Sequence, residues 1–130
     1  MSNLAVNTDR HLQPRDYRSD LPPIWCLGCG NFGVLSALFK AMSACNLDPA
    51  RTVVVSGIGC SSRLPGFVAT YGYHGVHGRA LPTATGIKCA RPDLNVLGVG
   101  GDGDGYSIGG GHLAHAARRN PDITYVIMNN

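Results

Sequence analysis

Three short apolar segments, each preceded by a segment with helical spacing, constrain the fold of this chain more than any other feature. Residues 52–56, 95–99 and 124–128 are rich in β-branched residues and lack apolar–polar alternation, which is typical of strands buried on both faces. The intervening helices are predicted at residues 31–45, 81–90 and 108–119. Strands that alternate with helices predict a mainly parallel sheet between two helical layers, a three-layer α/β/α fold.

The remaining segments define the domain organisation. Residues 1–23 are polar and contain three prolines, which predicts an extended N-terminal arm. Residues 57–78 form a glycine-rich passage, with a short helix expected near residues 67–71. Residues 24–130 then form a single domain, which we expect to be incomplete at its C-terminus because the sequence stops directly after the third strand. We therefore expect a fragment of a longer protein.

Composition excludes several classes of protein. Charged residues make up only 15% of the chain, and its net charge is +3 with scattered arginines, so we expect no nucleic-acid partner. No apolar run reaches the length of a membrane span, and residues 1–23 lack the apolar centre of a signal peptide, so we expect a cytoplasmic protein without a membrane partner. Five cysteines are an odd set, and in a reducing compartment they favour a metal or a cluster over disulfides.

A Gly-Asp-Gly segment and an Asn-Asn pair follow consecutive predicted strands. Asp102 lies in the first and Asn130 in the second, and 25 residues separate Gly103 from Asn129. This is the length of one strand–helix–strand crossover, so the two side chains should meet at the carboxyl edge of the sheet. Both offer oxygen ligands that suit Mg²⁺, and Mg²⁺ commonly completes its shell with phosphates.

The Gly-Asp-Gly segment has three alternative interpretations: an ordinary turn, a dinucleotide-binding site and a P-loop. Gly-Asp-Gly alone is also common in ordinary turns. A dinucleotide site is disfavoured because no G-x-G-x-x-G begins at Gly101 or Gly103, and a P-loop is disfavoured because no Gly-Lys-Ser/Thr occurs.

The five cysteines fall into three groups. Cys26 and Cys29 form a C-x-x-C motif, which by itself fits a redox dithiol, zinc or an iron–sulfur cluster. Cys60 lies in a glycine-rich turn that leaves the first strand, at the same edge as Asp102. Cys45 and Cys89 lie on predicted helices, where we expect small buried side chains.

These motifs together resemble a known family. The Gly-Asp-Gly and Asn-Asn pair is similar to the binding motif of thiamine diphosphate enzymes. Residues 25–30, 56–62, 77–82, 84–86 and 101–110 look like the β subunit of 2-oxoacid:ferredoxin oxidoreductases, most closely the 2-oxoglutarate enzymes. The resemblance implies that residues 24–130 are the N-terminal part of a thiamine diphosphate-binding domain.

The same resemblance implies the cofactors and their ligands. Asp102 and Asn130 would bind Mg²⁺. Cys26, Cys29 and Cys60 would bind a 4Fe–4S cluster whose fourth ligand lies beyond residue 130. The residues implied in thiamine diphosphate binding are Ile58, Gly59, Cys60, Ser61, His77, Gly103 and Asp104. Arg63, two residues after Ser61, is a candidate for the substrate carboxylate, although a solvated arginine is as good an interpretation.

The implied reaction is the oxidative decarboxylation of a 2-oxoacid with coenzyme A, with electrons passing to ferredoxin. All eight acidic residues are aspartates, so the glutamate that activates thiamine diphosphate would come from a partner α subunit. Two alternatives remain open. One is a thiamine diphosphate-dependent decarboxylase or synthase without a cluster, and the other is a non-catalytic metal- or cluster-binding module.

Overall fold

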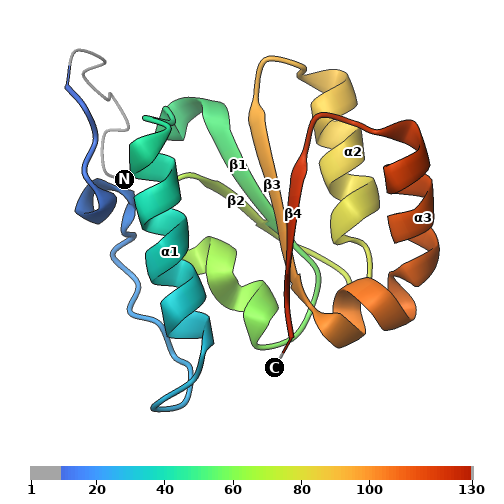
Figure 1. Cartoon of the computed structure of the whole chain (residues 1–130), viewed down its shortest axis with the longest axis horizontal. Coiled ribbons are helices and arrows are strands. Elements are labelled where there is room, and N and C mark those ends of the chain that lie inside the picture. The colour runs from blue at the N-terminus through green and yellow to red at the C-terminus, as the bar shows by residue number, and fades with distance from the viewer. Residues whose placement is uncertain (1–9, 130) are drawn as a thin grey trace.

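The computed structural model describes residues 10–129, and within this range it forms one sheet with strand order β2-β1-β3-β4, in which all neighbours are parallel. The strands are β1 (Thr52–Ser56), β2 (Tyr71–His74), β3 (Asn95–Gly101) and β4 (Thr124–Met128). The longer helices are α1 (Asn31–Ala44), α2 (Ala80–Ala90) and α3 (Gly110–Arg119). Figure 1 shows α1 on one face of the sheet and α2 and α3 on the other. The predicted three-layer fold is confirmed.

Strand β2 is the main difference from the sequence prediction. It pairs with β1 in the register Val53 to Tyr71 through Ser56 to His74, yet all four of its residues are exposed. A strand exposed on both faces carries no apolar pattern, so the sequence showed only a glycine-rich passage. The short helix expected near residues 67–71 instead lies earlier, as a 3₁₀ helix at Ser61–Phe67.

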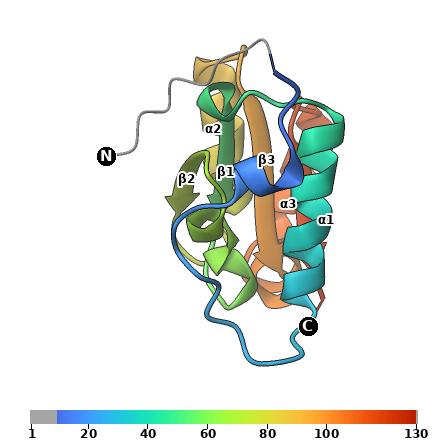
Figure 2. The same cartoon turned by 90° about the vertical axis from the view of Figure 1, so that its left-hand side faces the viewer.

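The α1 face of the sheet holds the larger core. The described part of the arm contributes to it, because residues Pro14–Tyr17 form a 3₁₀ helix rather than extended chain and bury the Tyr17 ring completely. The Tyr17 hydroxyl lies 3.0 Å from the carbonyl oxygen of Met42 and 2.8 Å from that of Leu47. Figure 2 shows the short helix of the arm next to α1. These contacts fix the segment around Tyr17 against α1, the helix that follows the C-x-x-C motif.

The opposite face is packed with smaller side chains. Its buried cluster consists of Val53, Val55, Ala84 and Val96, and α3 buries none of its residues.

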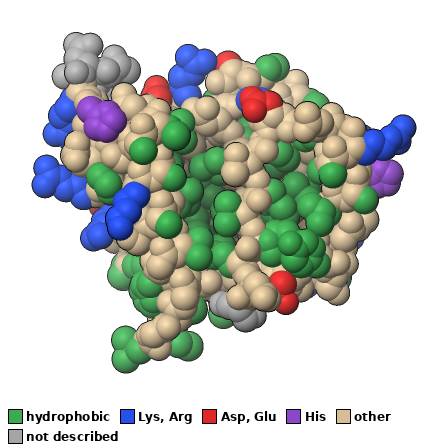
Figure 3. Space-filling view, viewed as in Figure 1, with side chains coloured by type: hydrophobic (Ala, Val, Ile, Leu, Met, Phe, Trp, Pro, Cys, Tyr) green, Lys and Arg blue, Asp and Glu red, His purple; other side chains and the backbone are tan. Residues whose placement is uncertain are grey.

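On the α1 side of the sheet, an apolar groove of about 490 Å³ opens between α1 and β4. Leu38 and Val126 line its walls (Figure 3). Among the described residues, no helix has both the length and the apolar character that crossing a membrane requires.

Candidate functional site

The carboxyl ends of all four strands meet at one edge of the sheet, as parallel pairing requires. Ser56 at the end of β1 is in register with His74 of β2 and with Val99 of β3, and Gly101 of β3 is in register with Met128 of β4. The turn after β1 therefore lies beside the loop after β2. The segment after β3, a π-helical turn at Gly103–Ile108, lies at the same edge. Short π-helical segments are frequent at functional sites.

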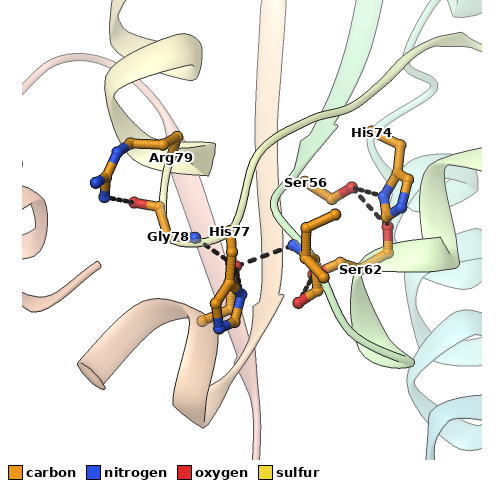
Figure 4. Close-up of polar contacts among 8 residues, drawn as sticks. Ser56, Ser62, His74, His77, Gly78 and Arg79 are labelled. Atoms are coloured by element: carbon orange, nitrogen blue, oxygen red, sulfur yellow. Dashed lines mark hydrogen bonds and ion pairs between the residues drawn. The ribbon is translucent and has the colours of Figure 1, made fainter. Parts of the chain in front are cut away.

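Asp104 is the buried centre of this edge, with a relative exposure of 2%. Its Oδ1 accepts hydrogen bonds from the backbone N–H of Ile58 at 3.0 Å and of Gly78 at 2.7 Å, and lies 2.9 Å from Nδ1 of His77 (Figure 4). These partners belong to the segments after β1 and β2. One carboxylate oxygen from the β3 loop therefore joins three loops of the carboxyl edge.

Glycines make room for this carboxylate. A Cβ on Gly57 would collide with both carboxylate oxygens of Asp104, and a Cβ on Gly100 would lie 2.8 Å from its Oδ2. The same position on Gly100 is 3.0 Å from the hydroxyl of Tyr125. Burial, together with the negative charges of Asp104 and Tyr106, raises the pKa of Tyr125 to about 12.

The turn after β1 is held at its other end by His74. Nδ1 of His74 lies 2.8 Å from the carbonyl oxygen of Ser62 and 3.0 Å from Oγ of Ser56. Oγ of Ser56 also donates to the Ser62 carbonyl at 2.5 Å. A carbonyl oxygen can only accept, so Nδ1 of His74 carries a proton. His74 and Ser56 thus anchor Ser62 beside the end of β2 (Figure 4).

Between these two anchors, the turn presents its predicted site residues to solvent. Ile58, Gly59 and Cys60 are exposed, whereas Ser61 is buried. Gly59 has a φ of +116°, a conformation that side chains other than that of glycine rarely adopt. In the 3₁₀ helix that follows, Arg63 is exposed.

The C-x-x-C loop contacts the same turn. The indole N–H of Trp25 donates to the carbonyl oxygen of Cys60 at 2.7 Å, and the Trp25 ring packs edge-on against Phe67 at a centroid distance of 4.9 Å. Cys26 is exposed and Cys29 is half-buried. The segments that carry the three predicted cluster cysteines therefore lie together, although within residues 10–129 no three His, Cys or Asp side chains are grouped closely enough to hold a metal ion.

Other predicted residues have mixed outcomes. Asp102 is half-buried and Gly103 exposed at the start of the π-helical turn. Asn130, the second predicted Mg²⁺ ligand, lies outside the described residues. The prediction that Cys45 and Cys89 are buried is wrong, since both are exposed. Cys45 directly follows α1, and Cys89 lies one residue before the end of α2.

Comparison with known proteins identifies the domain. Residues 57–130 match the family model described as thiamine pyrophosphate enzyme, C-terminal TPP binding domain. The chain belongs to this family. The match includes the turn after β1, His77 and the Asp102–Asp104 segment, so the edge described above lies within the family's domain.

Proteins similar to the chain share a narrower description. It is 54% identical over 114 residues to 2-oxoacid:ferredoxin oxidoreductase 1, subunit beta, of Aeropyrum pernix, covering 88% of this chain and 36% of that protein. It is 46% identical over 123 residues to 2-oxoglutarate oxidoreductase subunit KorB of Mycobacterium tuberculosis, covering 95% and 33%.

A solved structure agrees with these relatives. The 2-oxoglutarate:ferredoxin oxidoreductase from Magnetococcus marinus, with 2-oxoglutarate, coenzyme A and succinyl-CoA bound, matches with a TM-score of 0.90 and 53% identity, covering 92% of this chain and 41% of the matched one. The chain thus spans about two fifths or less of the length of these relatives.

Sequence reasoning missed the anchoring contacts of the site. Nothing in the spacing of residues indicated that Asp104 binds backbone N–H groups of Ile58 and Gly78, because these partners are 46 and 26 residues away. The role of His74 was missed for the same reason. The indole of Trp25 offered one signal, since a tryptophan next to a cysteine motif needs a hydrogen-bond acceptor when it is buried.

Proposed function

We propose that the chain is part of the β subunit of a 2-oxoacid:ferredoxin oxidoreductase that acts on 2-oxoglutarate. One observation carries the proposal: Trp25 links the C-x-x-C loop to Cys60, and Asp104 links the turn containing Cys60 to the Gly-Asp-Gly segment. The segments that carry the three cysteines and Asp102 are thus joined to one another by hydrogen bonds. The descriptions of the similar proteins support the assignment. The reaction is the oxidative decarboxylation of a 2-oxoacid with coenzyme A to acyl-CoA and CO₂, with electrons delivered to ferredoxin.

The donor set fits the metal groups of such an enzyme. Asp102 is a half-buried carboxylate at the carboxyl edge and would bind Mg²⁺ together with Asn130, because Mg²⁺ prefers oxygen ligands. Cys26, Cys29 and Cys60 would bind a 4Fe–4S cluster, with a fourth ligand from outside these residues. A cytoplasmic location, where thiols stay reduced, suits such ligands.

The residues around the turn have two roles toward thiamine diphosphate. Ile58, Gly59, Cys60, His77 and Gly103 are at least partly exposed and would contact it. The remaining two, Ser61 and Asp104, are buried and would support those contacts from behind. When bound, thiamine diphosphate supplies the electron sink for decarboxylation, and the cluster supplies a one-electron acceptor.

A partner subunit completes the proposed site. Activation of thiamine diphosphate needs a glutamate, and the 130 residues contain none, so an α subunit would provide it. Large apolar side chains are exposed close to the site residues, as a partner surface requires. They are Leu27, Ile58, Tyr106 and Ile108.

Arg63 is the candidate for substrate selection. Its side chain is exposed next to the turn that carries Cys60 and would pair with a carboxylate of 2-oxoglutarate. We expect Arg63→Ala in the complete complex to raise KM for 2-oxoglutarate more than KM for pyruvate. Equal increases for both substrates would exclude this role.

The cluster is tested with the full-length subunit, expressed with its partner and purified without oxygen. We expect iron and sulfide in the wild type, loss of most of the iron in Cys60→Ser, and wild-type iron in the matched control Cys89→Ser, because Cys89 is exposed on α2 away from the turn. Iron-free wild-type protein that still binds thiamine diphosphate with Mg²⁺ would favour the decarboxylase or synthase alternative. Wild-type protein that does not bind thiamine diphosphate would contradict both the proposed oxidoreductase and the decarboxylase or synthase alternative.

A further inference from the structure

His77 and Asp104 form a pair whose hydrogen positions are set by the surrounding contacts. Oδ1 of Asp104 already accepts the backbone N–H groups of Ile58 and Gly78. An oxygen that receives two N–H donors leaves no position for a proton of its own, so it can only accept from the third partner. The hydrogen between Oδ1 and Nδ1 of His77, which lie 2.9 Å apart, therefore belongs to the imidazole.

The burial of the two side chains differs and gives the pair a direction. The side chain of Asp104 is 1% exposed, whereas that of His77 is 41% exposed. The contact at Nδ1 turns one side of the ring toward the protein (Figure 4). The other ring nitrogen, Nε2, is then the one available to a ligand at the carboxyl edge.

The position of Asp104 is itself over-determined. Its Oδ2 is buried and has no hydrogen-bond partner among the described residues. The carboxylate fits against the α-carbons of Gly57 and Gly100, where any Cβ would collide with it or press closely on it. A group held in this way has little freedom to move toward solvent. Such rigidity is what a residue needs in order to position a second side chain.

We propose that Asp104 is a positioning residue that fixes His77 in the tautomer with Nδ1 protonated and presents Nε2 to the ligand. The proposal deepens the proposed function, on which its assignment of a ligand rests. In the neutral ring, Nε2 is a hydrogen-bond acceptor. It therefore suits a hydroxyl or amino proton of the bound substrate or cofactor and does not suit the oxygens of a diphosphate, which only accept.

The pair also connects His77 to the turn that carries Cys60. Asp104 binds Ile58 with the same oxygen that contacts His77. A shift of the carboxylate would move the imidazole and the backbone of Ile58 together. Asp104 thus sets the relative placement of two groups that face the ligand without contacting the ligand itself.

The tautomer is tested by nitrogen-15 NMR of the full-length subunit in its complex, labelled at histidine, with the His77 signals identified by their loss in His77→Gln. We expect a protonated Nδ1 and an unprotonated Nε2 in the neutral ring of the wild type, before any cofactor is added. A neutral His77 with its proton on Nε2 would overturn the proposal. This measurement stands even if the complex fails to bind thiamine diphosphate, so the two proposals fail separately.

Two variants of Asp104 separate positioning from folding. Asp104→Asn keeps an oxygen acceptor in place, so we expect the His77 tautomer to be retained. In Asp104→Ala, the acceptor is lost, and we expect the His77 signals to move to a mixture of tautomers and the affinity for thiamine diphosphate with Mg²⁺ to fall about 10- to 100-fold, the usual cost of removing a residue that orients a ligand. An unchanged tautomer in folded Asp104→Ala would contradict the proposal. If this variant does not fold, the wild-type tautomer decides.

Discussion

At the carboxyl edge of the sheet, a Cβ on Gly57 would collide with the carboxylate of Asp104, whereas a Cβ on Gly86 in α2 would meet no heavy atom within 4 Å. The chain contains 18 glycines, and composition alone does not distinguish these two positions. At the edge, the missing side chain admits a buried acid of the protein itself. On α2, it leaves only an exposed gap in a helix. The difference shows that glycine content alone does not indicate where a chain approaches a ligand.

Gly57→Ala tests the crowded side of this comparison and should have the largest effect. The added methyl group would displace the Asp104 carboxylate and disturb its hydrogen bonds to Ile58 and Gly78. We expect the free energy of unfolding of the full-length protein to fall by about 1–3 kcal/mol, as for other overpacked sites. Denaturant unfolding measures the change. Wild-type stability would mean that the carboxylate can move away freely.

The pH dependence of stability tests the same site through Tyr125. Burial raises the pKa of its phenol to about 12 in the folded protein, from an ordinary value of 10.0. Below pH 10 the phenol is protonated in both the folded and the unfolded protein, so its contribution to the free energy of unfolding is fully present. As the pH rises from 10 toward 12, only the unfolded state loses the proton, so stability must fall.

Tyr125→Phe should therefore flatten the decline in stability above pH 10. Part of the decline should remain, because burial also raises the pKa of Tyr17. Denaturant unfolding at several pH values provides the comparison. Equal declines in the variant and the wild type would show that Tyr125 titrates normally in the folded protein.

Gly86→Ala tests the open side of the comparison. The residue is exposed within α2 and has open space around it, so alanine should raise the free energy of unfolding by roughly 0.5–1 kcal/mol through its better helix propensity. Thermal unfolding of this variant and of Gly57→Ala compares the same substitution at two positions, where we expect changes of opposite sign in the free energy of unfolding. Destabilisation by Gly86→Ala would remove the contrast.

The smallest effect is expected at an exposed ion pair between Arg91, which directly follows α2, and Asp93. Arg91 donates to both carboxylate oxygens of Asp93, at 2.8 and 2.7 Å, and this contact lowers the pKa of Asp93 to about 2. Because both groups are exposed and solvent screens their attraction, Asp93→Asn should change the free energy of unfolding less than any of the substitutions above. A change as large as that of Gly57→Ala would show that crowding around Asp104 is not what dominates stability.

The fold was largely predictable because its signal is local. Buried β-branched runs identified β1, β3 and β4, and helical spacing identified α1 and α2. Strand β2 escaped because neither of its faces is buried. The helix expected at residues 108–119 was predicted as one element, but a π-helical turn ends at Ile108 and α3 begins at Gly110.

The location of the site could be predicted from the sequence, but its hydrogen bonds could not. Parallel strands guarantee that their carboxyl ends meet, which predicted that Cys60 and Asp102 lie at one edge. His77 follows β2, which the sequence did not reveal, and it was named only through the family resemblance. The hydrogen bonds of Asp104 were not predictable, since two of its partners are backbone N–H groups that every residue except proline carries. Whether Cys26, Cys29 and Cys60 bind a cluster remains a prediction.

The bond between Trp25 and the carbonyl oxygen of Cys60 has a practical consequence. Trp25 is the one tryptophan among these 130 residues, and its indole rests against the backbone of a cysteine proposed to hold iron. Its fluorescence is therefore an intrinsic optical sensor of that turn. Any event that shifts the Cys60 backbone, including assembly or loss of an inorganic centre, should change the emission without an attached label.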